Sequence, residues 1–279
     1  MFQINWKTKA LFFKFLNFFK LYKLLFFIQK RITKRSRINL KGVFFYWDYH
    51  LKYLKENNVK SVLEIGAGKS LAQNIYLSYK FDQKIEQTLI DVSKMIDLDL
   101  FNEANDQISK ILGVNRLPFA SSIDDLKKNY NLSYLAPMNL KKVNENNLKF
   151  DACISSTTLE HLPKKELEES FYLLKKIIRK DGIISASIDY SDHYSHTDNK
   201  IGNLNFLKFS DEQWNQYNTP MLFQNRLRHQ DYRELFKTCG YKVSEIKGKL
   251  GEQPEYISKE FNTKNEETFV LWGHFLLKL

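Results

Sequence analysis

The chain has 279 residues, enough to bury one large hydrophobic core, and no Pro-, Gly- or Ser-rich linker divides it. Its formal net charge of +11 is concentrated at one end, because eleven Lys and Arg precede residue 43 and no acidic residue precedes Asp48. The remaining 32 basic residues balance 32 acidic ones, which argues against a nucleic-acid-binding surface spread over the folded part.

Residues 1–45 form a basic, aromatic segment that we separate from a folded domain of residues 46–279. Aromatic residues at three- and four-residue steps predict an amphipathic helix whose apolar face carries Phe12, Phe15, Phe18, Phe19, Tyr22 and Phe26. Lysines interrupt the apolar run before it reaches the roughly 18 to 20 residues that span a bilayer, and no secretory cleavage site follows. We therefore expect residues 10–37, with the basic stretch Lys30–Arg37, to lie on an anionic membrane surface. The alternatives are docking of this face on the chain's own domain and, less in keeping with its composition, a mitochondrial presequence.

The segment Val62–Ser70 predicts a buried strand, a glycine-rich turn and a helix beginning at about Leu71. Gly66 and Gly68 allow a tight turn and a close approach of a ligand to the main chain. The third glycine of the dinucleotide fingerprint is missing at position 71, and the spacing excludes a P-loop. Glu64 would repel phosphates, so the turn suits a cationic or neutral cofactor such as S-adenosylmethionine, which has a sulfonium, an ammonium and no phosphate.

A second strand is predicted at Gln87–Asp91, and it also ends in an acid. Asp91 can contact a ligand, cap a helix from Lys94 onward, or do both. A further buried strand is predicted at Phe150–Ser156, followed by Leu159–Leu162.

The next elements are a helix that includes Leu173–Lys180, a turn at Asp181–Gly182 and a strand at Ile183–Ile188. Cys153 and Cys239 lie far apart in the sequence and match no disulfide or zinc motif. Both are expected to be reduced thiols of a cytoplasmic protein.

Candidate acid–base residues follow two of these strands. His161 comes just after Phe150–Ser156, where it either faces a ligand or packs on the first helical turn. Asp189, Asp192, His193 and His196 lie within eight residues directly after the last of these strands. They form either a solvated loop or a site for a base or a divalent metal. We expect His193 to be the base, oriented by Asp189 or Asp192, and no metal, since no defined metal signature is present.

Beyond residue 197, Ser210 is typical of a helix N-cap, and a later helix is expected to end at Gly240. Asn225, Arg226 and Arg228 either grip a phosphate or carboxylate of the substrate or form a solvated helix face. The last two strands are expected at Tyr241–Ile246 and Thr268–Leu277, closing a sheet with antiparallel pairing.

Over residues 58–190 these landmarks, in this order and at this spacing, resemble class I S-adenosylmethionine-dependent methyltransferases. The resemblance implies an α/β fold with a doubly wound, mostly parallel, seven-stranded Rossmann-like sheet. It implies that Asp91 holds the ribose hydroxyls and that Asn139 stands near the adenine, where an acid is common; Asp124 and Asp125 are the alternatives for that position. The implied cofactor-binding set is Glu64, Gly66, Gly68, Asp91, Asn139 and Ser156.

The arrangement after residue 190 resembles methyltransferases of bacterial surface-polysaccharide biosynthesis, in which an insert, here about residues 190–235, covers the acceptor. We expect O-methylation of a glycan or glycolipid precursor at the cytoplasmic face of a membrane. One alternative acceptor is a membrane lipid or quinone. A further alternative is a non-catalytic, membrane-associated scaffold that retains the cofactor fold.

Overall fold

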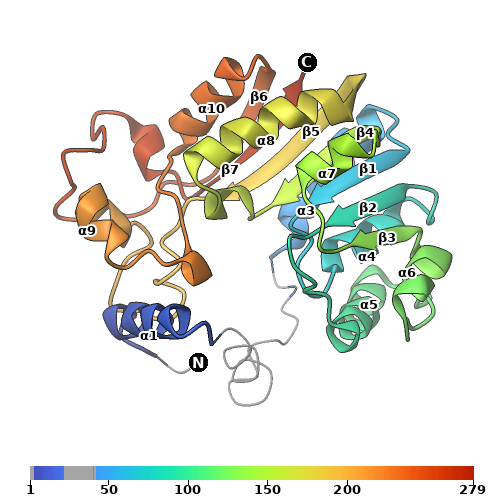
Figure 1. Ribbon diagram of the computed structural model, residues 1–279, viewed down its shortest axis with the longest axis horizontal. Helices are drawn as coiled ribbons and strands as arrows, with labels where there is room; N and C mark the ends of the chain where they lie inside the picture. The colour runs from blue at the N-terminus through green and yellow to red at the C-terminus, as the bar shows by residue number, and fades with distance from the viewer. Residues whose placement is uncertain (1–2, 22–39, 41) are drawn as a thin grey trace.

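The computed structural model describes residues 3–21, 40 and 42–279, and its centre is a seven-stranded sheet (Figure 1). The strand order is β3-β2-β1-β4-β5-β7-β6. All pairings among β1 to β5 are parallel, whereas β7 runs antiparallel between β5 and β6. The doubly wound, mostly parallel α/β sheet predicted above is confirmed. The strands are β1 Ser61–Ile65, β2 Glu86–Ile90, β3 Leu132–Leu135, β4 Phe150–Ser156, β5 Ile178–Asp189, β6 Lys242–Lys247 and β7 Trp272–Lys278.

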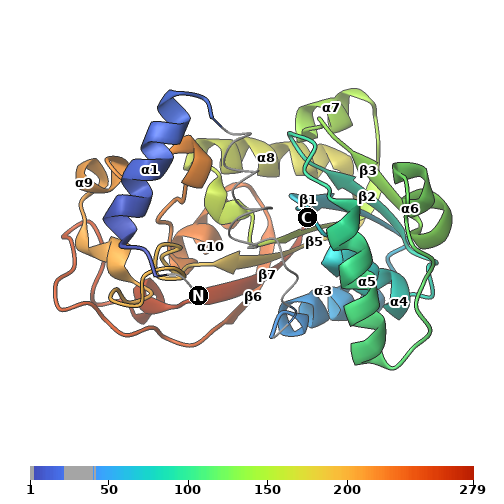
Figure 2. The ribbon, with the colours of Figure 1, turned by 90° about the horizontal axis from the view of Figure 1, so that it is seen from below.

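Helices cover both faces of the sheet (Figures 1 and 2). One face is covered by α3 Phe44–Glu56, α4 Ala72–Lys80, α5 Leu98–Leu112 and α6 Ile123–Tyr130. The other is covered by α7 Leu140–Glu145, α8 Lys164–Ile177 and α10 His229–Thr238. Because the core is buried between helices and sheet on both faces, the carboxyl ends of the parallel strands form the open edge where ligands bind in such folds.

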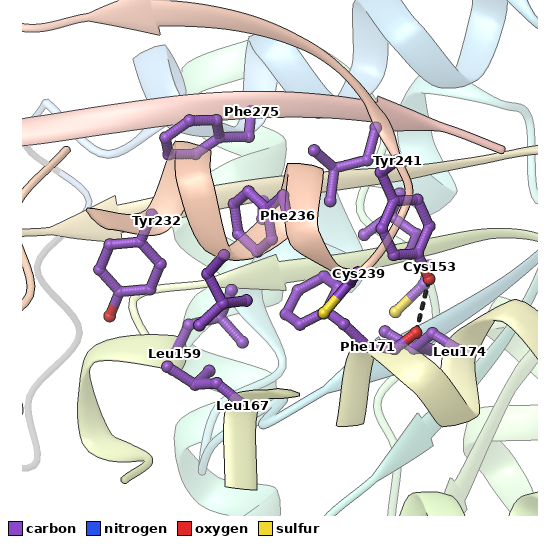
Figure 3. Close-up of a cluster of buried hydrophobic side chains, with 14 of the residues drawn as sticks. Cys153, Leu159, Leu167, Phe171, Leu174, Tyr232, Phe236, Cys239, Tyr241 and Phe275 are labelled. Carbon is purple, nitrogen blue, oxygen red and sulfur yellow. Dashed lines mark hydrogen bonds between the residues drawn. The ribbon is translucent and has the colours of Figure 1, made fainter. Parts of the chain in front are cut away.

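The core on the α8 and α10 face is rich in aromatic residues (Figure 3). The ring centroids of Phe171 and Phe236 are 4.6 Å apart. The hydroxyl of Tyr241 donates a hydrogen bond to the carbonyl oxygen of Phe171 at 2.7 Å, which ties the start of β6 to α8. Cys153 and Cys239 are buried as free thiols in this core, and burial raises the pKa of both.

The segment between β5 and α10 forms a separate small core with the N-terminal helix α1 Trp6–Phe18. In Figures 1 and 2, α1 lies beside the helix α9 Asp211–Asn215. Trp6 is buried there, and its backbone N–H donates to Oδ2 of Asp198 at 2.9 Å. Ser210 caps α9 through a capping box, as predicted. Among the described residues, no helix is both long and apolar enough to cross a bilayer.

Several boundaries differ from expectation. The helix expected from Lys94 begins at Leu98, because the side chain of Asp97 caps it by accepting from the N–H groups of residues 99 and 100. The turn expected at Asp181–Gly182 lies within β5, where the register with β4 shifts. A Cβ at Gly182 would lie 2.5 Å from the carbonyl oxygen of Asp151, so glycine permits this close pairing of the two strands.

The helix α3 follows the basic N-terminal segment and had no counterpart in the sequence analysis. Its buried residues Trp47, His50 and Leu54 face the sheet. Tyr22, Phe26 and Lys30–Arg37, which complete the predicted membrane-surface segment, lie outside the described residues.

Candidate cofactor and acceptor site

The glycine-rich turn lies between β1 and α4, at the carboxyl edge of the sheet. Gly66 and Gly68 have φ values of +76° and +75°, a region that favours glycine. A Cβ at Gly66 would lie 2.5 Å from side-chain atoms of Thr158, so this glycine admits the loop after β4. Among the described residues, a Cβ at Gly68 would meet no atom within 4 Å. Within that part of the chain, the turn is therefore closed on its Gly66 side and open at Gly68.

Asp91 follows β2 at the same edge, and its carboxylate is held in place from two directions. The Tyr134 hydroxyl donates to Oδ2 of Asp91 at 2.8 Å, and the backbone N–H of Gly68 faces the same carboxylate from the turn. Burial raises the pKa of Asp91 although the Tyr134 hydroxyl and the Gly68 N–H both act to lower it. The helix-capping role that the sequence left open for Asp91 belongs instead to Asp97. The structure thus brings together the turn and the acid that the resemblance assigns to one cofactor.

Glu64 lies beneath the turn and not in open space. Its carboxylate accepts hydrogen bonds from Gln73 Nε2 at 3.1 Å and from Asn74 Nδ2, so it fastens the first turn of α4 to β1. Burial raises the pKa of Glu64 to about 8. The observed contacts of Glu64 stabilise the turn. A direct contact between Glu64 and a cofactor stays a prediction.

The hydroxyl of Ser156, at the end of β4, is engaged in a buried network. It donates to Oε1 of Gln73 at 2.6 Å and lies 2.9 Å from Nε2 of His50. His50 Nδ1 lies 2.8 Å from the hydroxyl of Ser185, which is 2.9 Å from Nε2 of His274. The network joins α3, α4, β4, β5 and β7 below the site, so the role of Ser156 seen here is structural, and its contact with a cofactor stays a prediction.

Asn139 lies beyond β3 and is exposed. Its side-chain oxygen accepts from the N–H of Lys142 at 3.0 Å and so caps α7. The alternative Asp125 belongs to the capping box of α6. Binding of adenine at either position stays a prediction.

The sequence-predicted acid–base residues meet at the ends of β4 and β5. His193 Nε2 lies 3.5 Å from Oδ2 of Asp189, and the ring of His193 lies between those of His161 and His196, at centroid distances of 5.0 and 5.3 Å. Burial acts to raise the pKa of Asp189, but hydrogen bonds from His193 and Ser191 outweigh it and hold that pKa below its usual value. The structure therefore provides an Asp–His pair beside a second imidazole.

Asp192, the other candidate to orient His193, is engaged elsewhere. Its carboxylate is fully buried and accepts from the N–H of Tyr194 at 2.8 Å and from Nδ2 of Asn205 at 3.0 Å. These contacts organise the loop after β5, and burial raises the pKa of Asp192 to about 6. Of the two aspartates, Asp189 is the one beside His193.

The three polar residues expected to grip a substrate are internal anchors. Arg228 is buried, and its guanidinium donates to the carbonyl oxygens of residues 190, 268 and 270 at 2.6 to 2.9 Å. Arg226 donates to the carbonyl oxygen of Phe206 at 3.0 Å and pairs with Asp211. Asn225 Nδ2 donates to the carbonyl oxygens of residues 159 and 162 at 3.0 and 2.8 Å. Both the substrate-gripping and the solvated-face interpretations were wrong, because the insert needs these groups to satisfy its own backbone.

Sequence reasoning missed two features of the site. Thr157, directly after β4, has φ of +47°, a conformation that costs a β-branched residue free energy and recurs at functional sites. Glu160 is 1% exposed, and among the described residues neither of its carboxylate oxygens has a hydrogen-bonding partner of good geometry. The backbone N–H groups of Glu160 and Asp189 act to lower its pKa, but burial raises that pKa well above its usual value. The available signal was an acid directly beside a candidate histidine.

No protein-family model and no curated protein sequence matches the chain. Solved structures do resemble it. One is a SAM-dependent methyltransferase from Archaeoglobus fulgidus, with 13% identity over 92% of this chain and 100% of that chain and a TM-score of 0.51. Another is magnesium protoporphyrin IX methyltransferase from Synechocystis with bound SAH, with 11% identity over 92% and 99% of the two chains and a TM-score of 0.50. The chain therefore shares the fold of these methyltransferases.

Proposed function

We propose that this chain is an S-adenosylmethionine-dependent methyltransferase that methylates an oxygen of a glycan or glycolipid precursor at a membrane surface. The observation that carries the first part is the junction of Gly68 and Asp91. The Gly68 N–H acts on the Asp91 carboxylate to lower its pKa, and among the described residues no atom lies within 4 Å of where a Gly68 Cβ would be. A bare backbone beside a buried acid fits a ligand that offers hydroxyls and a positive charge, and S-adenosylmethionine offers both.

Bound there, S-adenosylmethionine would supply an electrophilic methyl group on its sulfonium. The residues of the chain would contribute alignment, which provides most of the acceleration in such a displacement. They would also remove the acceptor's proton. With Nε2–H of His193 directed at Asp189, the Nδ1 lone pair of His193 can accept the hydroxyl proton, and the Asp189 carboxylate stabilises the imidazolium that forms.

The side chains that follow β4 and β5 support an oxygen atom as the methyl acceptor. His161, His193 and Asp189 are groups that bind and deprotonate a hydroxyl. A glycan offers many hydroxyls, whereas a quinone or lipid offers few. Products missing from a deletion strain test this part: loss of a methylated sugar supports the proposal, and loss of a methylated quinone or lipid contradicts it.

The membrane part of the proposal rests on the outer face of α1. The inner face, with Trp6 and Ala10, is buried against the insert. The outer face exposes aromatic residues, including Phe15 at 54% and Phe18 at 79%, beside the exposed Lys14. Large exposed apolar groups mark interaction sites, and a helix whose only charged side chains are lysines favours an anionic lipid surface. Docking α1 on the insert would bring the acceptor-binding side of the enzyme to a lipid-linked substrate.

Vesicle sedimentation tests this part with the full chain. We expect binding to vesicles that contain phosphatidylglycerol, weaker binding to phosphatidylcholine alone, and release at high salt. The double variant Phe15→Glu/Phe18→Glu should bind at least about tenfold more weakly, since each buried Phe contributes roughly 1.5 to 3 kcal/mol. Tyr172→Glu is the control, because Tyr172 is 51% exposed on the distant α8. Equal binding by the double variant and the control would remove the membrane proposal.

A further inference from the structure

The buried carboxylate of Glu160 has no role in the proposed proton transfer. Its side chain is 1% exposed, and neither oxygen has a partner of good geometry among the described residues. A buried carboxylate without a partner is costly unless a proton or a cation compensates it. The backbone around it is firmly held, because the carbonyl oxygen of Glu160 accepts from the N–H of Asn225 at 2.7 Å. The carboxylate is therefore buried on a held backbone, without a counterpart in the described part of the chain.

Two imidazoles beside Glu160 each have one ring nitrogen near an oxygen acceptor. His161 Nδ1 lies 2.7 Å from the carbonyl oxygen of Phe223, which must accept, so Nδ1 carries the proton and Nε2 keeps its lone pair. His193 Nε2 lies 3.5 Å from Asp189, which favours the tautomer that leaves the Nδ1 lone pair free. Histidines that bind metals are held in this manner, with the second nitrogen directed at a carbonyl or carboxylate oxygen.

We propose that Glu160, His161 and His193 bind one divalent first-row transition-metal ion at the carboxyl edge of the sheet. Their potential ligand atoms, one from each residue, all lie within 4.8 Å of one another. Ligands at about 2.1 Å from a shared ion are at most about 4.2 Å apart, so small side-chain rotations complete the site. Two imidazoles and one carboxylate suit Zn²⁺, Co²⁺ or Fe²⁺ better than Mg²⁺ or Ca²⁺, which prefer oxygen ligands only. No metal was expected from the sequence, since no defined metal signature is present; the ligands of this cluster come from two separate segments, after β4 and after β5.

The ion's role rests on the proposed methyl transfer, although its binding does not. His161 is exposed, so an ion bound here can keep coordination positions open to solvent or to an acceptor. A hydroxyl bound to the ion would lose its proton to water more readily, as metal-bound water does. The oxygen would then form the new bond to the methyl carbon while the carbon–sulfur bond breaks and its electron pair stays on sulfur. In this arrangement His193 is a ligand and not the base.

The test uses Co²⁺ as the probe, because its visible absorption reports ligation directly. The full-length protein, stripped with a chelator and without S-adenosylmethionine, should bind one equivalent of Co²⁺ and gain thermal stability. Glu160→Gln, His161→Ala and His193→Ala should each weaken binding by about tenfold or more. Glu160→Gln should also melt at a higher temperature than the wild type without metal at pH 9, since the amide replaces a buried acid that loses its compensating proton in alkali. His196→Ala is the matched control, because His196 stacks on His193 outside the cluster.

Three results would overturn the site: no Co²⁺ bound by folded wild-type protein, unchanged affinity in Glu160→Gln, or an equal loss in His196→Ala. Calorimetry with S-adenosylmethionine on the same samples separates this inference from the proposed function. Co²⁺ binding without S-adenosylmethionine binding would leave the metal site standing and remove the methyltransferase proposal. The reverse result would leave His193 as the base.

Discussion

The hydroxyl of Tyr134 joins two elements of the cofactor site, since it donates to Oδ2 of Asp91 at 2.8 Å and accepts from the N–H of Met95 at 3.0 Å. It fixes the Asp91 carboxylate at the end of β2 against the loop that follows. In the proposed function, Asp91 accepts from the ribose hydroxyls, and Tyr134 only orients it. The two residues should therefore differ in their effect on binding.

We expect Asp91→Asn to weaken S-adenosylmethionine binding by about 1.5 to 3 kcal/mol, the value of hydrogen bonds to a charged group. Tyr134→Phe should weaken it by less, about 0.5 to 1.5 kcal/mol. Asp151→Asn is the matched control, since Asp151 also accepts several hydrogen bonds, from residues 60 and 61, at the opposite end of the sheet. Calorimetry that ranks Asp151→Asn with Asp91→Asn would contradict the assignment.

The raised pKa of Glu64, about 8, predicts a pH dependence of stability. Between its unfolded value of about 4.5 and about 8, the folded state keeps a proton that the unfolded state has released, so stability falls as pH rises through this window. In Glu64→Gln this contribution is absent. The melting temperature of the variant relative to wild type should therefore increase from pH 5 to pH 8. A constant difference over that range would refute the link.

His274 predicts the opposite behaviour in acid. Its ring is buried between the hydroxyls of Ser185 and Ser187, and burial lowers its pKa to about 3. Below pH 6.5 the unfolded state takes up a proton that the folded state refuses, so stability is lost as pH falls toward 3. From pH 6.5 to 5 this loss is about 1.6 kcal/mol, because the slope approaches 1.36 kcal/mol per unit only below the unfolded pKa. Urea unfolding of His274→Gln should show a drop smaller by that amount, and an unchanged drop would contradict the prediction.

The docking of α1 predicts a contrast between two aromatic residues of one helix. Trp6 packs on the rings of Tyr217 and Phe209 at centroid distances of 4.7 and 5.5 Å, whereas Phe15 is exposed. Trp6→Ala should lower the free energy of unfolding, or of local release of α1, by about 3 to 5 kcal/mol. Phe15→Ala should change it by less than about 0.5 kcal/mol. Protease sensitivity of the N-terminal segment measures both, and equal sensitivity would show that α1 is not docked.

The sheet was predictable because its strands carry local signals. The buried strand before Gly66 and the acid at Asp91 are readable from residue order, and six of the seven strands were expected close to their observed positions. The short strand β3 at the sheet edge was not located from the sequence. Helix boundaries were less predictable, because the side chain of Asp97, and not that of Asp91, caps α5. The antiparallel closure at β7 was also expected, and the pairing of β7 with both β5 and β6 confirms it.

The site was only partly predictable because its chemistry depends on which atoms are already engaged. Arg228 has the sequence appearance of a substrate-binding residue, yet three backbone carbonyls take its donors. Asp189 and Asp192 look equivalent in sequence, and only the fold separates the partner of His193 from the loop anchor. Glu160 is the opposite case, because its carboxylate has no partner of good geometry among the described residues. The order of residues in the sequence does not reveal such a missing partner.

Calorimetry with S-adenosylmethionine tests the central claim most directly, using Gly68→Val and Gly113→Val as a matched pair. Both glycines have positive φ, +75° and +65°, and a Cβ at either meets no atom of the described residues within 4 Å, so the backbone cost should be similar. We predict that the wild type and Gly113→Val bind S-adenosylmethionine with equal affinity. Gly68→Val should bind it at least about tenfold more weakly, because the added side chain would occupy the space beside the glycine-rich turn. No binding by folded wild-type protein, or equal affinity in the two variants, would contradict the account.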